Sequence, residues 1–580
     1  MKTMPALLAL LLPLAPANAR DTAPRPDQGM VSAADPRAAM AGVEILRAGG
    51  SATDAAIATM LALGVVEPQN SGIGGGSFWV SHTARGAKTT TIDARETAPA
   101  AADPRWFYDD AGRPMSHADA VPGGRSVGVP GALRGMALAH RQSGVLPWAA
   151  LFGPAIRLAH DGFVVTPRLV NGLARNGRHV TPETRALYTA ADGSSLKVGA
   201  MLRNPAHAAL LERIAQTGAD SFYVGPQAQK IVATVNGAAR NPSRMTTGDL
   251  ATYEAKSRPP VCVKYRVYRI CGMGPPSSGG ITVLMILKQL ERFDMAALGK
   301  DDATAWHLFA ESSRLAYADR NLYIGDPDYV RVPVKGMLDA RYLASRSALI
   351  TPDRTIATVA AGTPPGARRR LPVPASEVAG TSDLVAADRQ GNVVEVTTTI
   401  EGYFGSGLSV DGIPLNNELT DFDTVPAKDG YLVANRVEGG KRPRSSMAPT
   451  IVYNPDGSVR LALGAAGGPT IIAQIAKALV GVLDWKMTAQ DAIAMGLLYA
   501  PGPGATAEQG TALEAMVPAL QALGETVKVA PLGLKANAIE RVGGRWVGAA
   551  DPRSEGVAIG EDGRVTEIKR VGNALSRPPE

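Results

Sequence analysis

The sequence predicts a soluble, globular chain built from both helices and strands. Hydrophobic residues make up 45% of the 580 residues and charged residues 19%, with 63 glycines and 43 prolines that allow many tight connections. Apolar residues recur at helical spacing over most of residues 127–335, whereas residues 382–388 and 392–400 alternate as strands do. The length predicts two or more structural units, or one large fused unit.

Residues 1–19 have the parts of a secretory signal. Lys2 precedes an apolar run over residues 6–14, and Ala17 and Ala19 form an A-x-A cleavage site. An uncleaved membrane anchor is the weaker interpretation, because a spanning helix needs about 20 apolar residues and this run is shorter and contains Pro13. We therefore expect a mature protein that is periplasmic or secreted, with no membrane association after signal cleavage.

Charge and cysteine content argue against two classes of function. The net charge is +7, but Lys and Arg are spread along the chain without interleaved aromatic residues, so no nucleic-acid partner is expected. Seven scattered histidines lack zinc-binding spacing, and no metal is expected. Cys262 and Cys271 either form a disulfide across a short hairpin, which export permits, or remain buried thiols.

The first part of the mature chain predicts two helices and a strand. Residues 35–50 have helical apolar spacing and end in two glycines, and a second helix begins at Ser51. The glycines of residues 72–76 precede a strand-like run instead of following one, so a dinucleotide site is not predicted. Arg95 ends the next strand, beside Glu96. A lone arginine is usually a surface ion pair, so its interest depends on its neighbours.

Two features precede the most informative stretch, residues 380–423. Ser277 and Ser278 lie before a helix that begins near Ile281, and no base motif accompanies them, so they are predicted to cap that helix. Residues 351–380 are rich in Pro, Gly, Ala and Arg without a period, which predicts a flexible connection. This connection ends at Gly380, immediately before Thr381.

A threonine behind a glycine suggests a specific chemistry. If the backbone is cut between Gly380 and Thr381, Thr381 gains a free α-amine that can act as the base for its own hydroxyl. Residues 382–388 and 392–400 read as a hairpin, and pairing Asp388 with Asn392 sets Thr381 opposite Thr399. Glu401 then lies on the same side, just beyond. One hairpin thus presents two hydroxyls and a carboxylate together.

Further polar groups follow along the chain. Glu418 and Asp421 are three residues apart, and Ser445 and Ser446 are adjacent. The pair Gly467-Gly468 lies between a predicted strand and a predicted helix. Amide groups at a helix N-terminus are suited to a developing oxyanion.

At this point the sequence resembles the γ-glutamyltransferase (γ-glutamyltranspeptidase) family of N-terminal nucleophile hydrolases. The resemblance runs from about Pro36 to Ser554 through GIGGG, ARETAP, MGPPSSGG, YADRNLYIGDPDYV, FGSG, LNNELTDF, KRPRSSMAPTI, GAAGG and ADPRSEG. It implies a four-layer αββα sandwich of the α/β (α+β) class. It also implies a precursor that cuts itself into a large fragment, residues 20–380, and a small fragment, residues 381–580, which stay together as a heterodimer. No cofactor is implied.

The resemblance gives each candidate residue a role. Thr381 matches the nucleophile and Thr399 the hydroxyl that supports it. The other groups match an oxyanion hole (Gly467, Gly468), a set that holds the substrate's α-carboxylate (Arg95, Ser445, Ser446) and a set that holds its α-ammonium (Glu418, Asp421). Three positions depart from the family: Asp383 stands where the family has His, Glu401 where the best-known members have Asn, and Thr420 where they have an acid. The lid stretch between Phe422 and Lys441 is also short, which implies a more open acceptor side.

The implied reaction is a ping-pong acyl transfer. Thr381 attacks the γ-carbonyl of glutathione or another γ-glutamyl amide, and water, an amino acid or a peptide takes the glutamyl group. Two alternatives remain. A cephalosporin or glutaryl acylase of the same fold acts on an acyl group without an α-amine, which gains nothing from a carboxylate cage. A non-catalytic periplasmic binder of amino acids or peptides would remain uncleaved.

Overall fold

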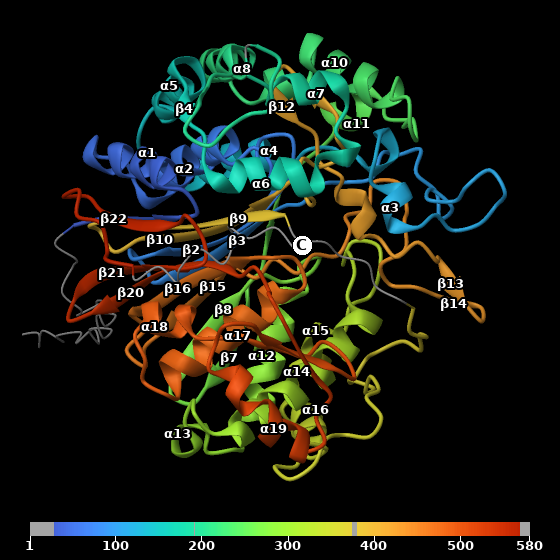
Figure 1. Cartoon of the computed structure of the whole chain (residues 1–580), viewed down its shortest axis with the longest axis vertical. Helices are drawn as coiled ribbons and strands as arrows, with labels where there is room; N and C mark the ends of the chain where they lie inside the picture. Colours follow the sequence, from blue (N-terminus) through green and yellow to red (C-terminus); the bar gives the residue numbers. More distant parts are fainter. Residues whose placement is uncertain (1–27, 191, 374–379, 569–580) are drawn as a thin grey trace, which may run out of the picture.

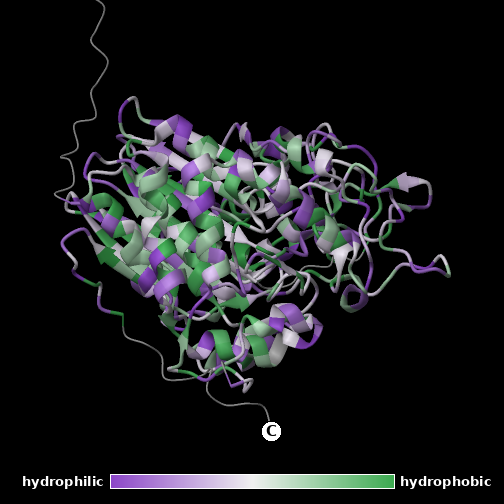
Figure 2. Ribbon diagram, turned by 90° about the horizontal axis from the view of Figure 1, so that it is seen from above, coloured by the Kyte–Doolittle hydropathy of each residue, from purple (hydrophilic) through white to green (hydrophobic). Residues whose placement is uncertain are grey.

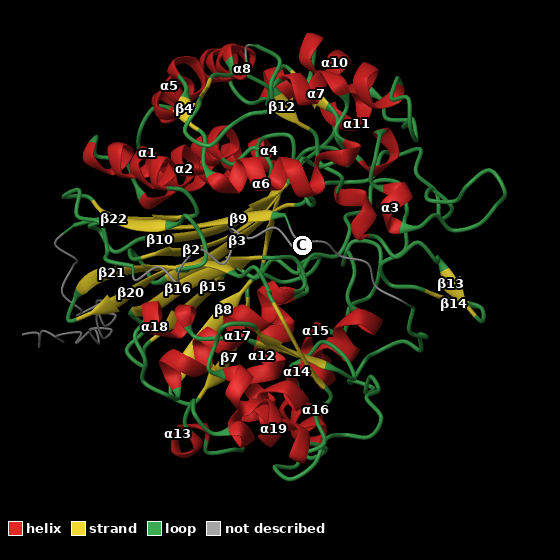
Figure 3. Ribbon diagram, in the orientation of Figure 1, coloured by secondary structure: helices red, strands yellow, loops and turns green. Residues whose placement is uncertain are grey.

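The computed structural model describes residues 28–190, 192–373 and 380–568. Two central sheets lie face to face, and helices cover the outer side of each (Figure 1, Figure 3). Hydrophobic segments gather in the body of these layers, whereas hydrophilic ones are common on peripheral loops (Figure 2). The four-layer αββα sandwich implied by the resemblance is confirmed. The predicted signal, residues 1–19, lies outside the described residues.

The first sheet is antiparallel and contains the hairpin that begins at Thr381. Its strands, in spatial order, are β22 (Val557–Gly560), β1 (Met30–Ala33), β9 (Thr381–Ala387), β10 (Val393–Thr399), β2 (Gly76–Thr83), β3 (Lys88–Ala94) and β6 (Lys256–Arg258). Thr381 pairs with Thr399, so the predicted register is confirmed.

The second sheet is also antiparallel. Its strands, in spatial order, are β21 (Arg545–Ala550), β20 (Lys535–Val542), β16 (Val459–Ala466), β15 (Thr450–Tyr453), β8 (Tyr268–Gly272) and β7 (Val261–Tyr265). A disulfide joins Cys262 and Cys271, which face each other across β7 and β8. The region 127–335, predicted to be mostly helical, therefore also supplies three strands to the central sheets.

The helices pack by burying apolar faces against the sheets. One layer includes α1 (Pro36–Arg47), α2 (Ala52–Val66), α4 (Ala132–Ser143) and, further out, α5 (Gly153–Asp161), α6 (Pro167–Asn176) and α8 (Pro205–Thr217); the other includes α12 (Gly279–Leu290), α14 (Ala303–Tyr323), α17 (Thr470–Leu483) and α19 (Leu513–Ala522). Ser51 caps α2 in a capping box with Asp54, as a helix starting at Ser51 predicts. Every residue of α2 is buried.

Strand β9 is buried on both faces, which fixes its position. Val385 and Ala387 join the core between the sheets, whereas Leu384 and Ala386 join the core under α1 and α2. Each sheet mixes strands from before and after Gly380, so a chain cut there would still share two hydrogen-bonded sheets.

The connection before Gly380 contains no helix or strand among its described residues, 351–373, but part of it is held firmly. The amide of Ile356 donates to Glu311 Oε2 (2.9 Å), and the amide of Gly362 donates to Asp319 Oδ1 (2.7 Å). Both bonds tie this connection to α14. Among the described residues, no helix is long and apolar enough to span a membrane.

Candidate active site

Thr381 is the first residue of β9 and directly follows the carbonyl group of Gly380. Thr399 Oγ1 donates a hydrogen bond to the carbonyl oxygen of Gly380 (2.5 Å). The amide of Glu401 donates to the same Thr399 oxygen (2.7 Å), so the hydroxyl proton of Thr399 is directed at Gly380. A donor at this carbonyl polarises the bond that the sequence predicts to be cut.

Two backbone positions make this contact possible. A Cβ on Gly380 would lie 2.2 Å from the carbonyl oxygen of Glu401, so only glycine fits there. Glu401 has φ of +74°, a left-handed conformation that costs a residue with a side chain on the order of 1 kcal/mol or more. The amide that donates to Thr399 thus belongs to a residue with a strained backbone.

The charged groups expected to hold an amino-acid head meet directly. The guanidinium of Arg95, 1% exposed, forms ion pairs with Glu418 and Asp421, and its Nη2 donates to the carbonyl of Arg444 (2.9 Å). Glu418 and Asp421 belong to a short 3₁₀ helix, Glu418–Asp421. Glu96 lies 4.0 Å from the same guanidinium.

Burial and mutual repulsion leave these carboxyl groups hard to ionise. Burial, with the nearby Glu418, raises the pKa of Glu96 well above its ordinary value. Burial, with Asp421 and Glu418, raises the pKa of Glu401 in the same way. Burial also raises the pKa of Glu418, although Arg95 opposes this. The site thus has more carboxyl groups than one arginine can balance and is primed to accept a cation.

Ser445 and Ser446 also line the pocket, together with the carboxyl groups. Arg320 in α14 donates through Nη2 to Ser446 Oγ (2.7 Å) and through Nε to Ser278 Oγ (2.8 Å). Ser278 Oγ donates to the carbonyl of Ser445 (2.6 Å) and makes no capping bond, so the predicted N-cap role of Ser278 is wrong. Ser277 Oγ does accept from the amide of Gly279, the first residue of α12 (3.2 Å).

The glycine pair lies where the sequence places it, between β16 and α17. Gly467 and Gly468 have φ of +131° and +58°, a region that favours glycine. Within the described ranges, neither amide donates a hydrogen bond to another protein group. Two unsatisfied N–H groups at the start of a helix are able to stabilise an oxyanion.

The structure brings the predicted residues together around a cavity of about 20 Å³, smaller than an amino acid. Its lining includes all the predicted catalytic and binding residues apart from Gly467, which adjoins it: Arg95, Thr381, Thr399, Glu401, Glu418, Asp421, Ser445, Ser446 and Gly468. Arg95, one of these lining residues, is paired directly with Glu418 and Asp421. A substrate head group would have to insert between these partners.

Sequence reasoning missed three residues of this site. Glu96 was visible beside Arg95 in ARETAP but was not assigned a role. Asn417 donates through Nδ2 to the Glu401 carboxylate and to Thr420 Oγ1 (3.0 Å). Arg320 lies in the motif YADRNLYIGDPDYV but was not assigned a role, and α14 brings it to Ser446 from 126 positions away.

Asp383, one departure from the family pattern, points into the layer between the sheets. Thr397 Oγ1 lies 3.0 Å from Asp383 Oδ2 and 3.3 Å from Glu395 Oε1. A Cβ on Gly464 of β16 would lie 2.2 Å and 1.9 Å from these two carboxyl oxygens, so glycine makes room for the pair. Burial raises the pKa of Asp383 to about 6, and burial with Asp383 raises the pKa of Glu395 well above normal.

One group of described residues has the make-up of a metal site, but an arginine already satisfies it. His307, Glu311 and Glu525 are buried with ligand atoms within 4.8 Å of one another. Arg314 forms ion pairs with both carboxylates, and His307 Nδ1 bonds Glu525 (2.7 Å). The guanidinium supplies the positive charge that a metal would bring, so the cluster is a structural network.

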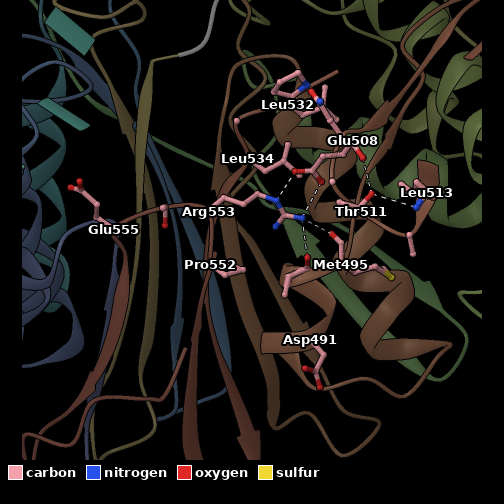
Figure 4. A pocket seen from close by; sticks show the side chains of 18 of the residues that line it. Asp491, Met495, Glu508, Thr511, Leu513, Leu532, Leu534, Pro552, Arg553 and Glu555 are labelled. Carbon is pink, nitrogen blue, oxygen red and sulfur yellow. Dashed lines mark hydrogen bonds and ion pairs between the residues drawn. The ribbon is translucent and has the colours of Figure 1, made fainter. Parts of the chain in front are cut away.

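A larger cavity, of about 1550 Å³, lies elsewhere and contains none of the predicted site residues (Figure 4). Arg553 reaches into it and is held by Glu508, with Nε–Oε1 of 2.5 Å and Nη2–Oε2 of 3.0 Å. Glu555 and Leu534 also line it, and Leu534 immediately precedes Lys535 of β20. Its Arg553–Glu508 pair is satisfied internally and offers no catalytic arrangement.

Comparisons with known proteins identify the family of this chain. The sequence model described as Gamma-glutamyltranspeptidase matches residues 38–561. A glutathione hydrolase proenzyme of Bacillus subtilis (strain 168) is 35% identical over 92% of this chain and 91% of its own. The acylase ACY 1 proenzyme of Pseudomonas sp. (strain SE83) is 34% identical over 92% and 94%. The crystal structure of cephalosporin acylase from Bacillus halodurans superposes with a TM-score of 0.79 at 26% identity, covering 95% of this chain and 99% of that one. The chain belongs to the γ-glutamyltranspeptidase family.

Proposed function

We propose that the chain is a γ-glutamyltransferase with glutathione hydrolase activity, matured by its own cleavage between Gly380 and Thr381. The observation that carries this proposal is the placement of the Gly380 carbonyl and Thr381 next to an arginine surrounded by carboxyl groups. The first part of this arrangement suits self-cleavage, and the second suits an amino-acid head group.

Maturation would use the same hydroxyl as turnover. Thr381 Oγ1 attacks the Gly380 carbonyl carbon, while the Thr399 hydroxyl stabilises the oxygen that becomes negative. The C–N bond breaks as the nitrogen takes a proton, which leaves an ester between Gly380 and Thr381. The same step frees the α-amine of Thr381. Water then hydrolyses the ester, which releases the Gly380 carboxylate and restores the Thr381 hydroxyl.

Turnover then follows from the free α-amine. The amine accepts the hydroxyl proton as Thr381 Oγ1 bonds to the γ-carbonyl carbon of the donor, and the amides of Gly467 and Gly468 stabilise the oxyanion. The donor's C–N bond breaks, and its nitrogen leaves with that proton. Water, an amino acid or a peptide attacks the γ-glutamyl ester and restores Thr381.

The carboxyl excess around Arg95 favours a donor that carries an α-ammonium. An α-amino acid head brings one positive and one negative charge, so it can pair with both Arg95 and the acids. A glutaryl group brings only a carboxylate, which pairs with Arg95 but leaves the buried acids without a cation.

Two similar proteins named as acylases make glutaryl or cephalosporin acylase the second candidate. Purified protein assayed with γ-glutamyl-p-nitroanilide and glutaryl-p-nitroanilide separates the two. We expect kcat/KM to be at least about 100-fold higher for the γ-glutamyl compound, because one desolvated charge pair strengthens binding by about that factor. A preference for the glutaryl compound would establish the acylase instead.

The remaining expectations belong to the same proposal. The two fragments, residues 20–380 and 381–580, stay together through both sheets, which mix strands from each. The mature enzyme acts on glutathione and related γ-glutamyl compounds in the periplasm or outside the cell.

A further inference from the structure

A buried lysine, Lys535, contacts the candidate nucleophile and is not among the residues that line its pocket. Lys535 begins β20 in the second sheet, and its side chain is 1% exposed. Its Nζ lies 3.3 Å from the carbonyl oxygen of Thr381 and 3.4 Å from Ser382 Oγ. Neither the maturation step nor the turnover step proposed above uses the Lys535 ammonium.

Lys535 is bonded to a carboxylate, although burial and a second cation lower its pKa. Its Nζ donates to Glu67 Oε2 (2.6 Å) at the end of α2, and Ser382 Oγ donates to the same oxygen (2.7 Å). Burial of Glu67 alone would raise its pKa, but Lys535 and Arg168 outweigh burial and lower it. Burial, with Arg168, lowers the pKa of Lys535 to about 8, so the ammonium form still predominates at pH 7.

The carboxylate does not cancel the lysine's charge, because Glu67 is shared. Arg168 Nε of α6 lies 3.1 Å from Glu67 Oε1. Two cations, Lys535 and Arg168, therefore contact the single carboxylate of Glu67. Glu555 accepts a hydrogen bond from the backbone amide of Arg168 (3.2 Å). Arg168 and Glu555 also line the cavity of about 1550 Å³ that opens beside Leu534 (Figure 4).

This charge bears on the α-amine that Thr381 gains on cleavage. Standard bond lengths place the nitrogen and carbonyl oxygen of one residue at most about 3.6 Å apart, so Lys535 Nζ lies within roughly 7 Å of that nitrogen. An ordinary α-amine has a pKa of about 7.7–8.0 and is mostly protonated at pH 7, when it cannot accept a proton. A neighbouring cation disfavours the protonated amine.

Other charged groups around Thr381 act in both directions. On the pocket side, carboxyl groups favour a protonated amine and Arg95 opposes them. The groups facing Thr381 or Lys535 from the packed elements are Arg95, Glu401, Glu418 and Asp421 in the pocket, Asp383 on β9, Glu67 on α2, Arg168 on α6 and Glu555 after β21. Lys535 is the cation whose ammonium contacts the backbone carbonyl of Thr381.

We propose that Lys535 is a positioning residue, whose ammonium holds the Thr381 carbonyl and whose charge favours the neutral form of the Thr381 α-amine. The inference rests on the proposed function, because it requires Thr381 to be a new N-terminus and the nucleophile. Glu67 and Ser382 fix the ammonium, and thereby fix the first residue of β9. Lys535 itself does not touch the substrate.

The test is the pH dependence of kcat/KM for γ-glutamyl-p-nitroanilide, whose acidic limb reports the base in the free enzyme. In Lys535→Met the limb should move to higher pH by about one unit, with KM within about twofold of wild type. Lys535→Arg should keep the wild-type limb. Lys477→Met is the matched control, because Lys477 is buried in α17 and bonds the carbonyls of Ile493 and Met495, away from Thr381.

A limb that stays in place in Lys535→Met overturns the inference, as does an equal shift in Lys477→Met. If Lys535→Met does not fold or mature, the wild-type protein provides the test. The α-amine pKa of Thr381 is measured by competitive acetylation at a series of pH values, with the acetylated fragment that starts at Thr381 detected by mass spectrometry. We expect an α-amine pKa below about 7.7. An α-amine pKa of about 7.7 or more contradicts the inference. If no such fragment exists, or wild type has no γ-glutamyl activity, the proposed function fails instead.

Discussion

The charged groups on the two sides of Thr381 differ in composition. In the pocket, one buried arginine faces four carboxyl groups, Glu96, Glu401, Glu418 and Asp421. Behind the strand, Lys535 and Arg168 share the carboxylate of Glu67. The first cluster has an excess of acid, whereas the second places two cations on the central carboxylate, with Glu555 beside Arg168.

The difference separates two tasks that one set of charges could not perform. The pocket must attract a substrate ammonium, and carboxyl groups do so, but they also favour protonation of any nearby amine. Lys535, which does not line the pocket, opposes that second effect at Thr381. The following changes test this division.

The largest effect is expected from the residue between the two clusters. Thr381→Ala removes the hydroxyl that both steps use, so γ-glutamyl-p-nitroanilide turnover should fall by at least about 10⁴-fold, to background. Thr381→Ser, which keeps a hydroxyl, should retain measurable turnover. Full activity in Thr381→Ala would show that another residue is the nucleophile.

The pocket cluster is tested by Glu418→Gln. This change keeps the shape but removes a charge from the ammonium site, and kcat/KM for γ-glutamyl-p-nitroanilide should fall by about 100-fold, mainly through KM. Glu291→Gln is the control, since Glu291 pairs with Lys288 on a partly exposed surface. An unchanged KM in Glu418→Gln would remove Glu418 from the ammonium site.

Thr399 is expected to matter most for maturation. Thr399→Val removes the donor to the Gly380 carbonyl and should slow cleavage of the precursor by at least about 10-fold, followed on denaturing gels. Thr398→Val is the matched control, because Thr398 Oγ1 bonds the carbonyl of Gly76 instead. Equal rates in the two variants would contradict the role given to Thr399.

The smallest effect is expected from the buried pair of acids Asp383 and Glu395. The pKa of Asp383 is raised to about 6, so the pair stabilises the fold most below its unfolded pKa, near 3.8, and this stabilisation is lost as pH rises through 6. Glu395→Gln lets an amide donate to the Asp383 carboxylate and should stabilise the protein by on the order of 2 kcal/mol at pH 8, with less effect at pH 5. Thermal unfolding at the two pH values measures this, and equal shifts in Tm would contradict it.

The hairpin at Thr381 was predictable because its information is local. Alternation over residues 382–400 and a short turn fix a register in which a shift of one residue would reverse every side chain. The roles of Arg95, Glu418 and Asp421 came from ordered motifs. Their direct contact with one another required the fold.

The cluster behind Thr381 was not predictable for the opposite reason. Glu67 ends an apolar helix, Arg168 starts another and Lys535 begins a strand, and these positions are separated by 101 and 367 residues. Each looks like an ordinary surface charge in its own segment. Only packing of the two sheets and the helical layer brings them within hydrogen-bonding distance.

The central claim is that the chain cuts itself before Thr381, and intact-mass analysis of the purified wild-type protein tests it most directly. The account predicts two masses, one of which matches a fragment from Thr381 to Glu580, while Thr381→Ala gives a single full-length mass. Uncleaved wild-type protein, or a two-fragment pattern that persists in Thr381→Ala, would contradict the account.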